Sequence, residues 1–337
     1  MTSIRGVAGS ATSSRTGRLV LASVVGLSLL VAGVLVGTAA TGRTPGPRPV
    51  GGSPAGASRR PPAPAQAPGP VSPQRIGRGG PIPFRRDACL AFAPTGRANG
   101  TTVFLDPGHG GSDPGAISVV DGRVVTEKQV TLAIARRALP LLRRSGYRVV
   151  MSRTGDTTVA RLRPSDVHRR VLTPAGAQRE IEARNLCADA ARATVLIALH
   201  MDSFSGRSAH GAEAFYCPNR PFAARSRRLA DALQRAIRAQ LSRAGLTPSD
   251  RGVLPDRAGG GAALTPQTAG YHHLIELGPA DPPWLPYPSL MPGVLLEPAF
   301  LSNPGDAAFV VSARGQRVLA AALVAGLHAY LRSPAPS

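Results

Sequence analysis

From about residue 100 onward, short apolar segments alternate with amphipathic segments, and this alternation constrains the fold more than any other feature of the chain. The apolar, β-branched segments end abruptly in polar loops and lie at residues 101–106, 147–152, 194–200, 212–217 and 293–300. Between them, the apolar periodicity predicts helices over residues 127–146, 222–245 and 313–331. Thr126 and Gly146 are the expected N-cap and C-cap of the first helix. The pattern predicts an α/β fold: a single layered domain with a central mixed, mostly parallel sheet flanked by helices.

The N-terminal part of the chain has a different character. A basic region, residues 1–18, precedes the uncharged stretch LVLASVVGLSLLVAGVLVGTAA at residues 19–40. This stretch is long enough to span a bilayer as a helix, and it also resembles a secretory signal peptide with small residues at its end. A transmembrane anchor and a cleaved signal peptide therefore both remain open. Either one predicts that the downstream chain is exported.

Residues 41–86 are rich in Pro, Gly, Ala and Arg and nearly lack large apolar side chains. Such a segment cannot bury enough surface to offset its chain entropy, so we predict a disordered, extended linker. The folded domain is then expected over residues 87–334. The net charge of the chain is +21, which favours anionic partners such as acidic lipid or an acidic polymer. No ladder of aromatic and basic residues is visible, so we do not expect nucleic acid as a partner.

The three cysteines, Cys89, Cys187 and Cys217, form no CxxC pair and no zinc-ribbon spacing. If the folded part is exported, one disulfide and one free thiol are expected. The sequence does not decide which two cysteines pair.

Four polar residues stand at the ends of the predicted elements. His109 follows the first strand, His200 ends the strand at 194–200, Glu297 lies near the end of the last strand, and Glu127 opens the first helix. In α/β sheets, sites form at the carboxyl ends of strands, so one pocket could gather all four. Taken singly, His109 could be a turn residue, His200 a core histidine, and Glu127 a helix-start residue favoured by the helix dipole. Glu297 is harder to explain in this way, because an unpaired carboxylate in an apolar strand is costly to bury.

Two imidazoles and one carboxylate form a common three-ligand zinc set that leaves a fourth position for water. A further carboxylate, not bound to the metal, can then act as general base. The four residues fit this scheme. A phosphate-binding loop does not fit, because DPGHGGSDPG lacks the lysine of GxxxxGK[ST]. A G-x-S-x-G serine elbow is also missing at the strand ends.

Over about residues 101–331, the chain resembles the zinc-dependent N-acetylmuramoyl-L-alanine amidases of the type 3 (AmiC-like) class. The resemblance is carried by DPGHGGSDPGA at 106–116 and by the segments TEKQVTL, ALHMDSF and EPAFLSNPGD, in that order, and RNLCADAARATVLIALH looks like the family's lead into the third motif. It implies that His109, Glu127 and His200 bind Zn²⁺ and that Glu297 is the catalytic residue. Asp106 and Asp113 are then candidates for orienting His109.

The chain also departs from the family pattern. Pro298 and Ala299 replace the usual pair after the catalytic glutamate, and the segments 154–183 and 251–292 differ from the typical lengths and compositions. Glu276, in LIELG, is a competing candidate for the base. We prefer Glu297, because the FLSNPGD that follows it matches the family motif.

The resemblance implies a peptidoglycan hydrolase that cleaves the amide between the lactyl group of N-acetylmuramic acid and L-alanine of the stem peptide. The expected substrate is peptidoglycan or a muropeptide, and the basic linker is expected to contact anionic lipid or wall polymer. We expect a monomer that acts outside the cytoplasm, either anchored by residues 19–40 or secreted to the cell wall. The alternatives are a catalytically silent amidase-like domain that binds wall or regulates a partner, and a membrane-anchored basic scaffold.

Overall fold

A mixed sheet flanked by helices forms the centre of the computed structural model, which describes residues 73–77, 80–259, 271–282 and 284–333. The sheet has eight strands in the order β1-β2-β6-β3-β9-β12-β10-β11. Their bounds are Gln74–Arg75 (β1), Ala88–Phe92 (β2), Thr102–Pro107 (β3), Arg148–Arg153 (β6), Val195–Leu199 (β9), Ala212–Tyr216 (β10), Asp250–Pro255 (β11) and Gly293–Glu297 (β12). The predicted fold class is confirmed.

The centre of the sheet is parallel, the strands on either side join it in antiparallel pairing, and β11 then pairs in parallel with β10. β3 pairs in parallel with β6 and β9, and β9 pairs in parallel with β12. β2 and β10 join this centre as antiparallel neighbours of β6 and β12. The carboxyl ends of β3, β9 and β12 therefore meet at one edge of the sheet, which is where the sequence placed His109, His200 and Glu297.

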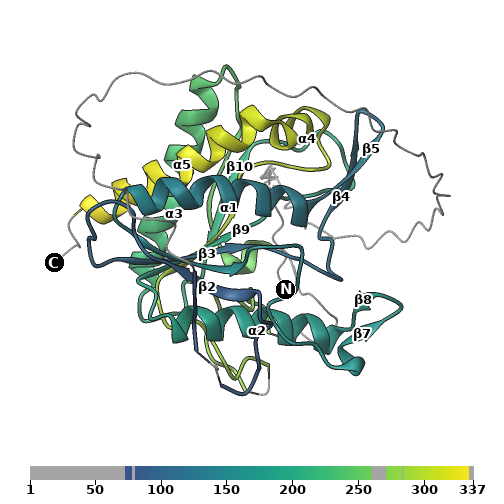
Figure 1. The fold of residues 1–337 in the computed structure, drawn as a ribbon. Coiled ribbons are helices and arrows are strands. Elements are labelled where there is room, and N and C mark those ends of the chain that lie inside the picture. Colours follow the sequence, from purple (N-terminus) through teal and green to yellow (C-terminus); the bar gives the residue numbers. More distant parts are fainter. Residues whose placement is uncertain (1–72, 78–79, 260–270, 283, 334–337) are drawn as a thin grey trace, which may run out of the picture.

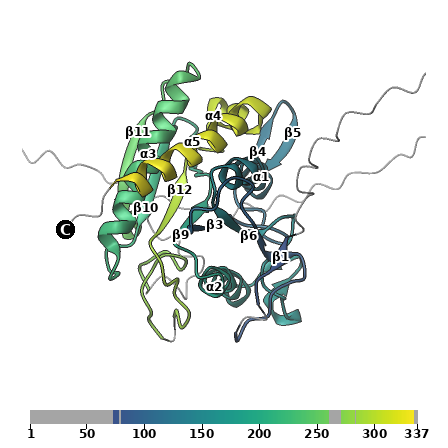
Figure 2. The same cartoon turned by 60° about the vertical axis from the view of Figure 1, so that its left-hand side comes forward.

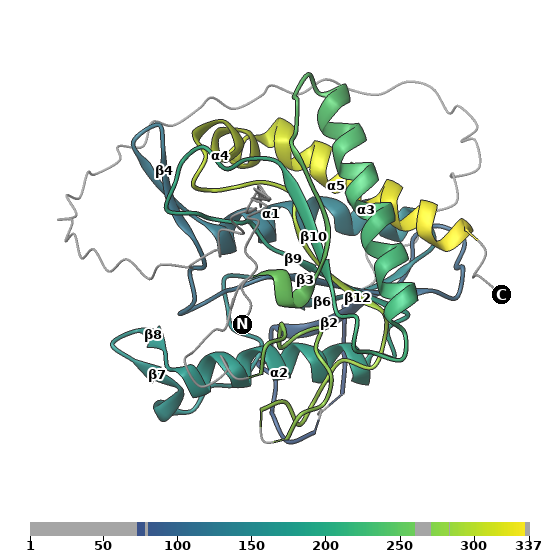
Figure 3. The same ribbon diagram turned by 180° about the vertical axis from the view of Figure 1, so that it is seen from behind.

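Helices cover both faces of the sheet (Figures 1 and 2). α1, α3 and α5 pack on one face, where α3 and α5 also contact each other, and Figure 3 shows α3 running beside β10. α2 lies on the opposite face and shares a second apolar cluster with residues of the segment 271–292. The helix bounds are Glu127–Arg144 (α1), Pro174–Ala190 (α2), Ala223–Arg243 (α3), Pro304–Val311 (α4) and Ala313–Arg332 (α5).

The smaller elements are two hairpins and two 3-10 turns. β4 and β5 pair just before α1, and β7 and β8 pair just before α2. Their bounds are Ile117–Val120 (β4), Arg123–Thr126 (β5), Val167–His168 (β7) and Val171–Leu172 (β8), and the turns are Pro164–Asp166 (η1) and Asp256–Gly259 (η2). The caps of α1 are close to expectation: Thr126 is the N-cap, Ser145 is the C-cap, and Gly146 follows with φ of +88°.

α2 is the longest of the elements that the sequence analysis did not predict, and its first half lies in the segment 154–183, which departs from the family pattern. Its buried face carries the polar residues Glu180, Arg184 and Asn185. An apolar stripe, which is the main sequence signal of a buried helix face, is therefore weak here.

The expectation of one disulfide and one free thiol agrees with the structure. Cys89 on β2 is bonded to Cys187 on α2, and Cys217 is free and buried. The disulfide ties the flank of the sheet to the helix that covers it. Burial, together with the charge of Asp256, raises the pKa of Cys217 to about 12.

The folded part begins before the expected boundary at residue 87. Gln74 and Arg75 pair with β2, Ile82 is buried, and Phe84 forms a bridge with Ala160. The end of the expected linker therefore packs on the domain, because its apolar residues Ile82 and Phe84 contact the domain. The predicted segment 19–40 and the rest of the linker up to residue 72 lie outside the described residues. Among the described residues, no single helix is long and apolar enough to cross a membrane; α4 and α5 pass only as a pair, which bends by 84°.

Candidate metal centre

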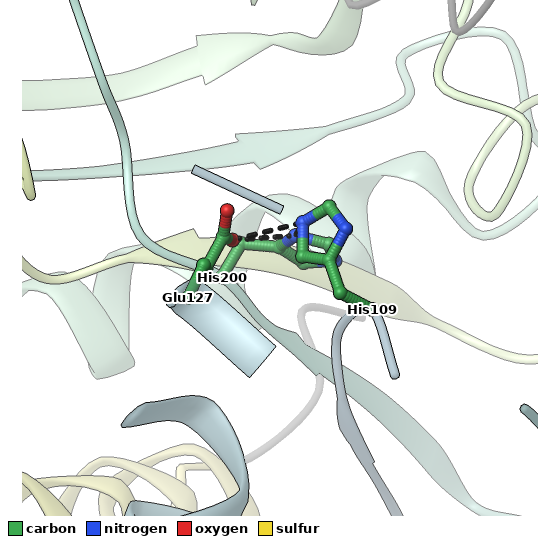
Figure 4. A group of neighbouring side chains, drawn as sticks. All are labelled: His109, Glu127 and His200. Carbon is green, nitrogen blue, oxygen red and sulfur yellow. Dashed lines mark hydrogen bonds and ion pairs between the residues drawn. The ribbon is translucent and has the colours of Figure 1, made fainter. Parts of the chain in front are cut away.

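Three of the sequence-predicted residues meet at the carboxyl edge of the sheet (Figure 4). His109 lies in the loop after β3, His200 follows β9, and Glu127 is the first residue of α1. The Glu127 Oε1 atom lies 3.0 Å from His109 Nε2 and 3.1 Å from His200 Nδ1. The two ring nitrogens are 3.1 Å apart. Three donor atoms from distant parts of the chain therefore surround one point.

The chemistry of this donor set fits a divalent metal such as zinc. Two neutral imidazole nitrogens facing each other need a proton or a cation between them, since each presents a lone pair. In a tetrahedral zinc site, with zinc–ligand distances of about 2.0–2.1 Å, neighbouring donors lie roughly 3.3 Å apart. The observed separations of 3.0 and 3.1 Å are close to that value.

Hydrogen bonds hold each donor in its orientation. Asp113 Oδ2 lies 2.8 Å from His109 Nδ1, which leaves Nε2 to face the centre. The backbone N–H groups of Met201 and Ala116 donate to the two oxygens of Glu127 at 2.8 and 2.9 Å. Such outer partners fix the ring orientation of a metal-binding histidine. Asp113, one of the two orienting candidates, therefore contacts His109, whereas the other, Asp106, pairs with an arginine.

The electrostatics of the cluster show how strongly its members interact. Burial alone would lower the pKa of His109, but the charges of Glu127 and Asp113 raise it to about 10. Burial would raise the pKa of Glu127, but the neighbouring imidazoles hold it well below its ordinary value. The cluster therefore favours an ionised carboxylate next to positive charge, which a bound cation can supply in place of protons.

Two glycines make room for these side chains. A Cβ atom on Gly108 would lie 2.3 Å from the His200 ring, and one on Gly115 would lie 2.6 Å from both Glu127 and His109. His109 itself has φ of +64°, a left-handed conformation that is uncommon for a residue other than glycine. The glycine-rich loop thus lets the backbone pass close to the cluster.

Two buried arginines, which the sequence analysis missed, donate hydrogen bonds to backbone carbonyl oxygens of the same loop. Arg153 donates to the carbonyl oxygens of Pro107 and Gly108, each at 2.9 Å. Arg184 donates to the carbonyl oxygen of His109 at 2.8 Å and pairs with Asp106 at 2.6 Å. Arg184 is the first residue of the RNLCADA segment that resembles the family motif. The role of Arg184 could not be predicted, because it depends on contacts between α2 and the end of β3.

Glu297 ends β12 beside this cluster, among other carboxylates. The backbone N–H of His200 donates to Leu296 O at 2.9 Å, so Glu297 follows directly on the strand next to His200. Acceptor oxygens of Glu297, Asp202 and Glu213 lie within 4.8 Å of one another. Burial and the charges of Asp202, Glu213 and Glu127 raise the pKa of Glu297 well above its ordinary value. Arg251 provides a nearby cation through its 2.8 Å ion pair with Glu213.

Glu276, the competing candidate, lies on another side of His200. One donor atom each from Glu276, Asp106 and His200 lie within 4.8 Å of one another, and Glu276 is buried. Burial and the charge of Asp106 raise its pKa well above the ordinary value. Glu276 therefore lies near His200 on the side of Asp106, whereas Glu297 lies at the end of β12, the strand next to β9.

A cavity of about 250 Å³ adjoins the loop that carries His109. Gly111 and Ser112 form one wall, residues 156–158 form another, and Arg85 and Arg161 contribute the cationic side chains. Asp156 adds a carboxylate to the same lining, so the cavity carries charges of both signs.

Comparisons with known proteins found related sequences. A family model for N-acetylmuramoyl-L-alanine amidases matches residues 103–329. The amidase LytC of Bacillus subtilis is 31% identical over 233 residues, which cover 69% of this chain and 36% of LytC. AmiC of Neisseria meningitidis is 28% identical over 243 residues, covering 68% of this chain and 53% of AmiC. The chain therefore spans about half or less of the length of these curated relatives.

A solved structure agrees with the fold. The crystal structure of an N-acetylmuramoyl-L-alanine amidase from Clostridium difficile 630 superposes with a TM-score of 0.50 at 26% identity. The match covers 71% of this chain and 100% of that structure. The part of the present chain that matches is thus a whole domain of that kind.

Proposed function

This chain belongs to the N-acetylmuramoyl-L-alanine amidase family, and on that premise we propose that it hydrolyses the amide between N-acetylmuramic acid and L-alanine in peptidoglycan. The observation that carries the proposal is the convergence of His109, Glu127 and His200 on one point, with Glu297 at the adjacent strand end. The names of two relatives, an N-acetylmuramoyl-L-alanine amidase and a probable cell wall amidase, support the same activity.

We assign His109, Glu127 and His200 as the residues that hold zinc. When bound, zinc polarises a carbonyl group and lowers the pKa of a water molecule, so that hydrolysis can proceed near neutral pH. Asp113 keeps the Nε2 atom of His109 directed at the centre through its 2.8 Å contact with Nδ1. The hydrogen bonds that Arg153 and Arg184 donate to the carbonyl oxygens of Gly108 and His109 hold the loop after β3 in this conformation.

Glu297 acts as the general base and then as the acid. It accepts a proton from the attacking water and returns it to the nitrogen of the leaving L-alanine. Its carboxyl group must be ionised for the first step, and a nearby positive charge favours ionisation. The backbone hydrogen bond between His200 and Leu296 fixes the distance between base and metal ligands.

The cavity beside the His109 loop is the proposed site for the stem peptide. Arg85 and Arg161, which line the cavity, would contact its carboxylates. This substrate implies that the folded domain works outside the cytoplasm, in agreement with the export signal or anchor expected at residues 19–40 and the basic linker that follows.

Metal content and turnover together test the proposal. Purified protein should bind zinc, and it should release lactyl-amide cleavage products from purified muropeptides, detected by mass spectrometry, until a chelator is added. His109→Ala and His200→Ala should lose metal at this centre, while Glu297→Gln should retain it and lose at least about 100-fold in kcat. Metal-loaded wild-type protein without turnover on either polymer or muropeptides would instead favour a catalytically silent wall-binding domain.

A further inference from the structure

A second group of metal-binding side chains lies at the opposite edge of the sheet from His109 and His200. Cys217 follows β10, Asp256 follows β11, and His273 belongs to the segment 271–292. β10 runs antiparallel to β12, so the end of β10 lies away from the edge where β12 ends at Glu297. One donor atom from each of the three residues lies within 4.8 Å of the others.

The contacts within this group converge on a single ring nitrogen. His273 Nδ1 lies 2.9 Å from Asp256 Oδ2 and 3.5 Å from Cys217 Sγ. In a catalytic triad, the nucleophile and the carboxylate use opposite nitrogens of the imidazole, so that the ring can relay a proton between them. Here both use the same nitrogen. This arrangement does not suit a cysteine nucleophile, but it suits three donors around one ion.

The separations also match a metal site. With zinc–sulfur distances of about 2.3 Å and zinc–nitrogen distances of about 2.0–2.1 Å, a tetrahedral site places sulfur and nitrogen roughly 3.5 Å apart. The observed distance between Cys217 Sγ and His273 Nδ1 is 3.5 Å.

A buried oxygen without a partner points to a ligand here. The side chains of Asp256 and His273 are 0% and 5% exposed. Asp256 Oδ1 is buried and has no hydrogen-bond partner among the described residues. Leaving a carboxylate oxygen unsatisfied costs free energy, and a cation bound between Asp256, Cys217 and His273 removes that cost.

Arg257 makes a contact that competes with an ion. Its guanidinium lies 3.2 Å from His273 Nε2 and can donate only while that nitrogen is unprotonated. Binding through Nδ1 moves the ring proton to Nε2, so Arg257 must then turn away. Arg257 is exposed, so it can do this without disturbing the core.

From this geometry we propose that Cys217, Asp256 and His273 bind a second divalent metal ion of the zinc class, with water in the fourth position. The ion cross-links the ends of β10 and β11 to the segment 271–292. Glu276 lies three residues beyond His273 in the chain and reaches Asp106 and His200. The second ion thus fixes the segment that packs under the first centre, and its role is structural.

Cobalt substitution separates the two centres, because only the second contains sulfur. Wild-type protein loaded with Co²⁺ should bind about two equivalents and show a thiolate-to-cobalt charge-transfer band. Cys217→Ser and His273→Ala should each bind about one equivalent without that band. His109→Ala should also bind about one equivalent but keep the band, because its second centre is intact.

Two further variants distinguish loss of the metal site from misfolding. Arg257→Gln should keep the band and bind Co²⁺ at least as tightly as wild type, since it removes the competing contact at Nε2. Asp256→Asn should weaken binding about 10-fold or more while retaining the thiolate band at saturating metal. Each variant is checked by circular dichroism, and the reactivity of Cys217 toward a thiol reagent should fall when metal is added to wild type.

The proposal is overturned if wild-type protein takes up metal at the first centre only, or if no thiolate band develops at saturating Co²⁺. Neither result depends on turnover. Conversely, a protein that shows the thiolate band but does not cleave muropeptides would contradict the proposed amidase activity and leave the second metal site standing.

Discussion

Glu213 on β10 lies directly opposite Glu297 on β12 in the antiparallel register of the two strands. Carboxylates opposite each other in a sheet repel, and the repulsion raises the pKa of Glu297 in addition to the effect of burial. The sheet register is therefore one cause of the raised pKa of the proposed base, besides burial and the charge of Asp202.

Glu213→Gln should shift the acid limb of the pH–rate profile. A base must be ionised, so activity falls as the pH drops below the pKa of Glu297. Removing the charge of Glu213 lowers that pKa, and the acid limb of kcat/KM should move to lower pH by about one unit. An acid limb that stays in place, or moves to higher pH, would show that Glu213 does not act on the base.

Asp202→Asn should flatten the dependence of stability on pH. Burial and the neighbouring Glu213 raise the pKa of Asp202 to about 8, whereas the unfolded value is about 3.9. The native state therefore binds more protons than the unfolded state between about pH 4 and 8. Over that window, metal-free wild-type protein should lose stability as the pH rises, and Asp202 should contribute at most about 1.4 kcal/mol per unit to this slope. Urea unfolding at several pH values measures the slope, which should be smaller in the variant, while the raised pKa values of Glu276 and Glu297 leave part of it in place.

Gly108→Ala should weaken metal binding at the first centre. Its Cβ atom would lie 2.3 Å from the His200 ring, so the ring or the loop must move. We expect a loss of about 1–3 kcal/mol in metal affinity, which is roughly 5- to 150-fold. The matched control is Gly206→Ala, where nothing lies within 4 Å of the added Cβ, and its affinity should equal that of wild type. Equal affinities for both variants would mean that the approach of Gly108 to His200 is not tight.

Arg184→Gln should destabilise the whole domain. It leaves Asp106 and Glu180 buried without their cation, since the ion pairs at 2.6 and 2.9 Å are lost. Breaking a buried pair in this way costs about 3–5 kcal/mol. Arg235, exposed on α3, is the control: Arg235→Gln should change the free energy of unfolding by less than about 0.5 kcal/mol. Thermal and urea unfolding would contradict the expectation if both variants behaved alike.

Local sequence predicted the elements whose residues alternate or repeat in a simple way. The strands that became β3, β6, β9, β10 and β12, and the helices that became α1, α3 and α5, all have an apolar face against the core. α2 was missed because its buried face contains Glu180, Arg184 and Asn185, whose burial depends on partners far away in the chain.

The sequence by itself determined which side chains stand at the ends of strands and at the start of the first helix, and this was enough to nominate His109, Glu127, His200 and Glu297. Only the tertiary structure decided which of them share an ion-sized space, which carboxylates crowd Glu297, and that Cys89 pairs with Cys187 rather than with Cys217. The physical reason is range: strand and helix periodicity are local, whereas ligand geometry, pKa shifts and disulfide pairing depend on distances of a few ångströms between segments far apart in the chain.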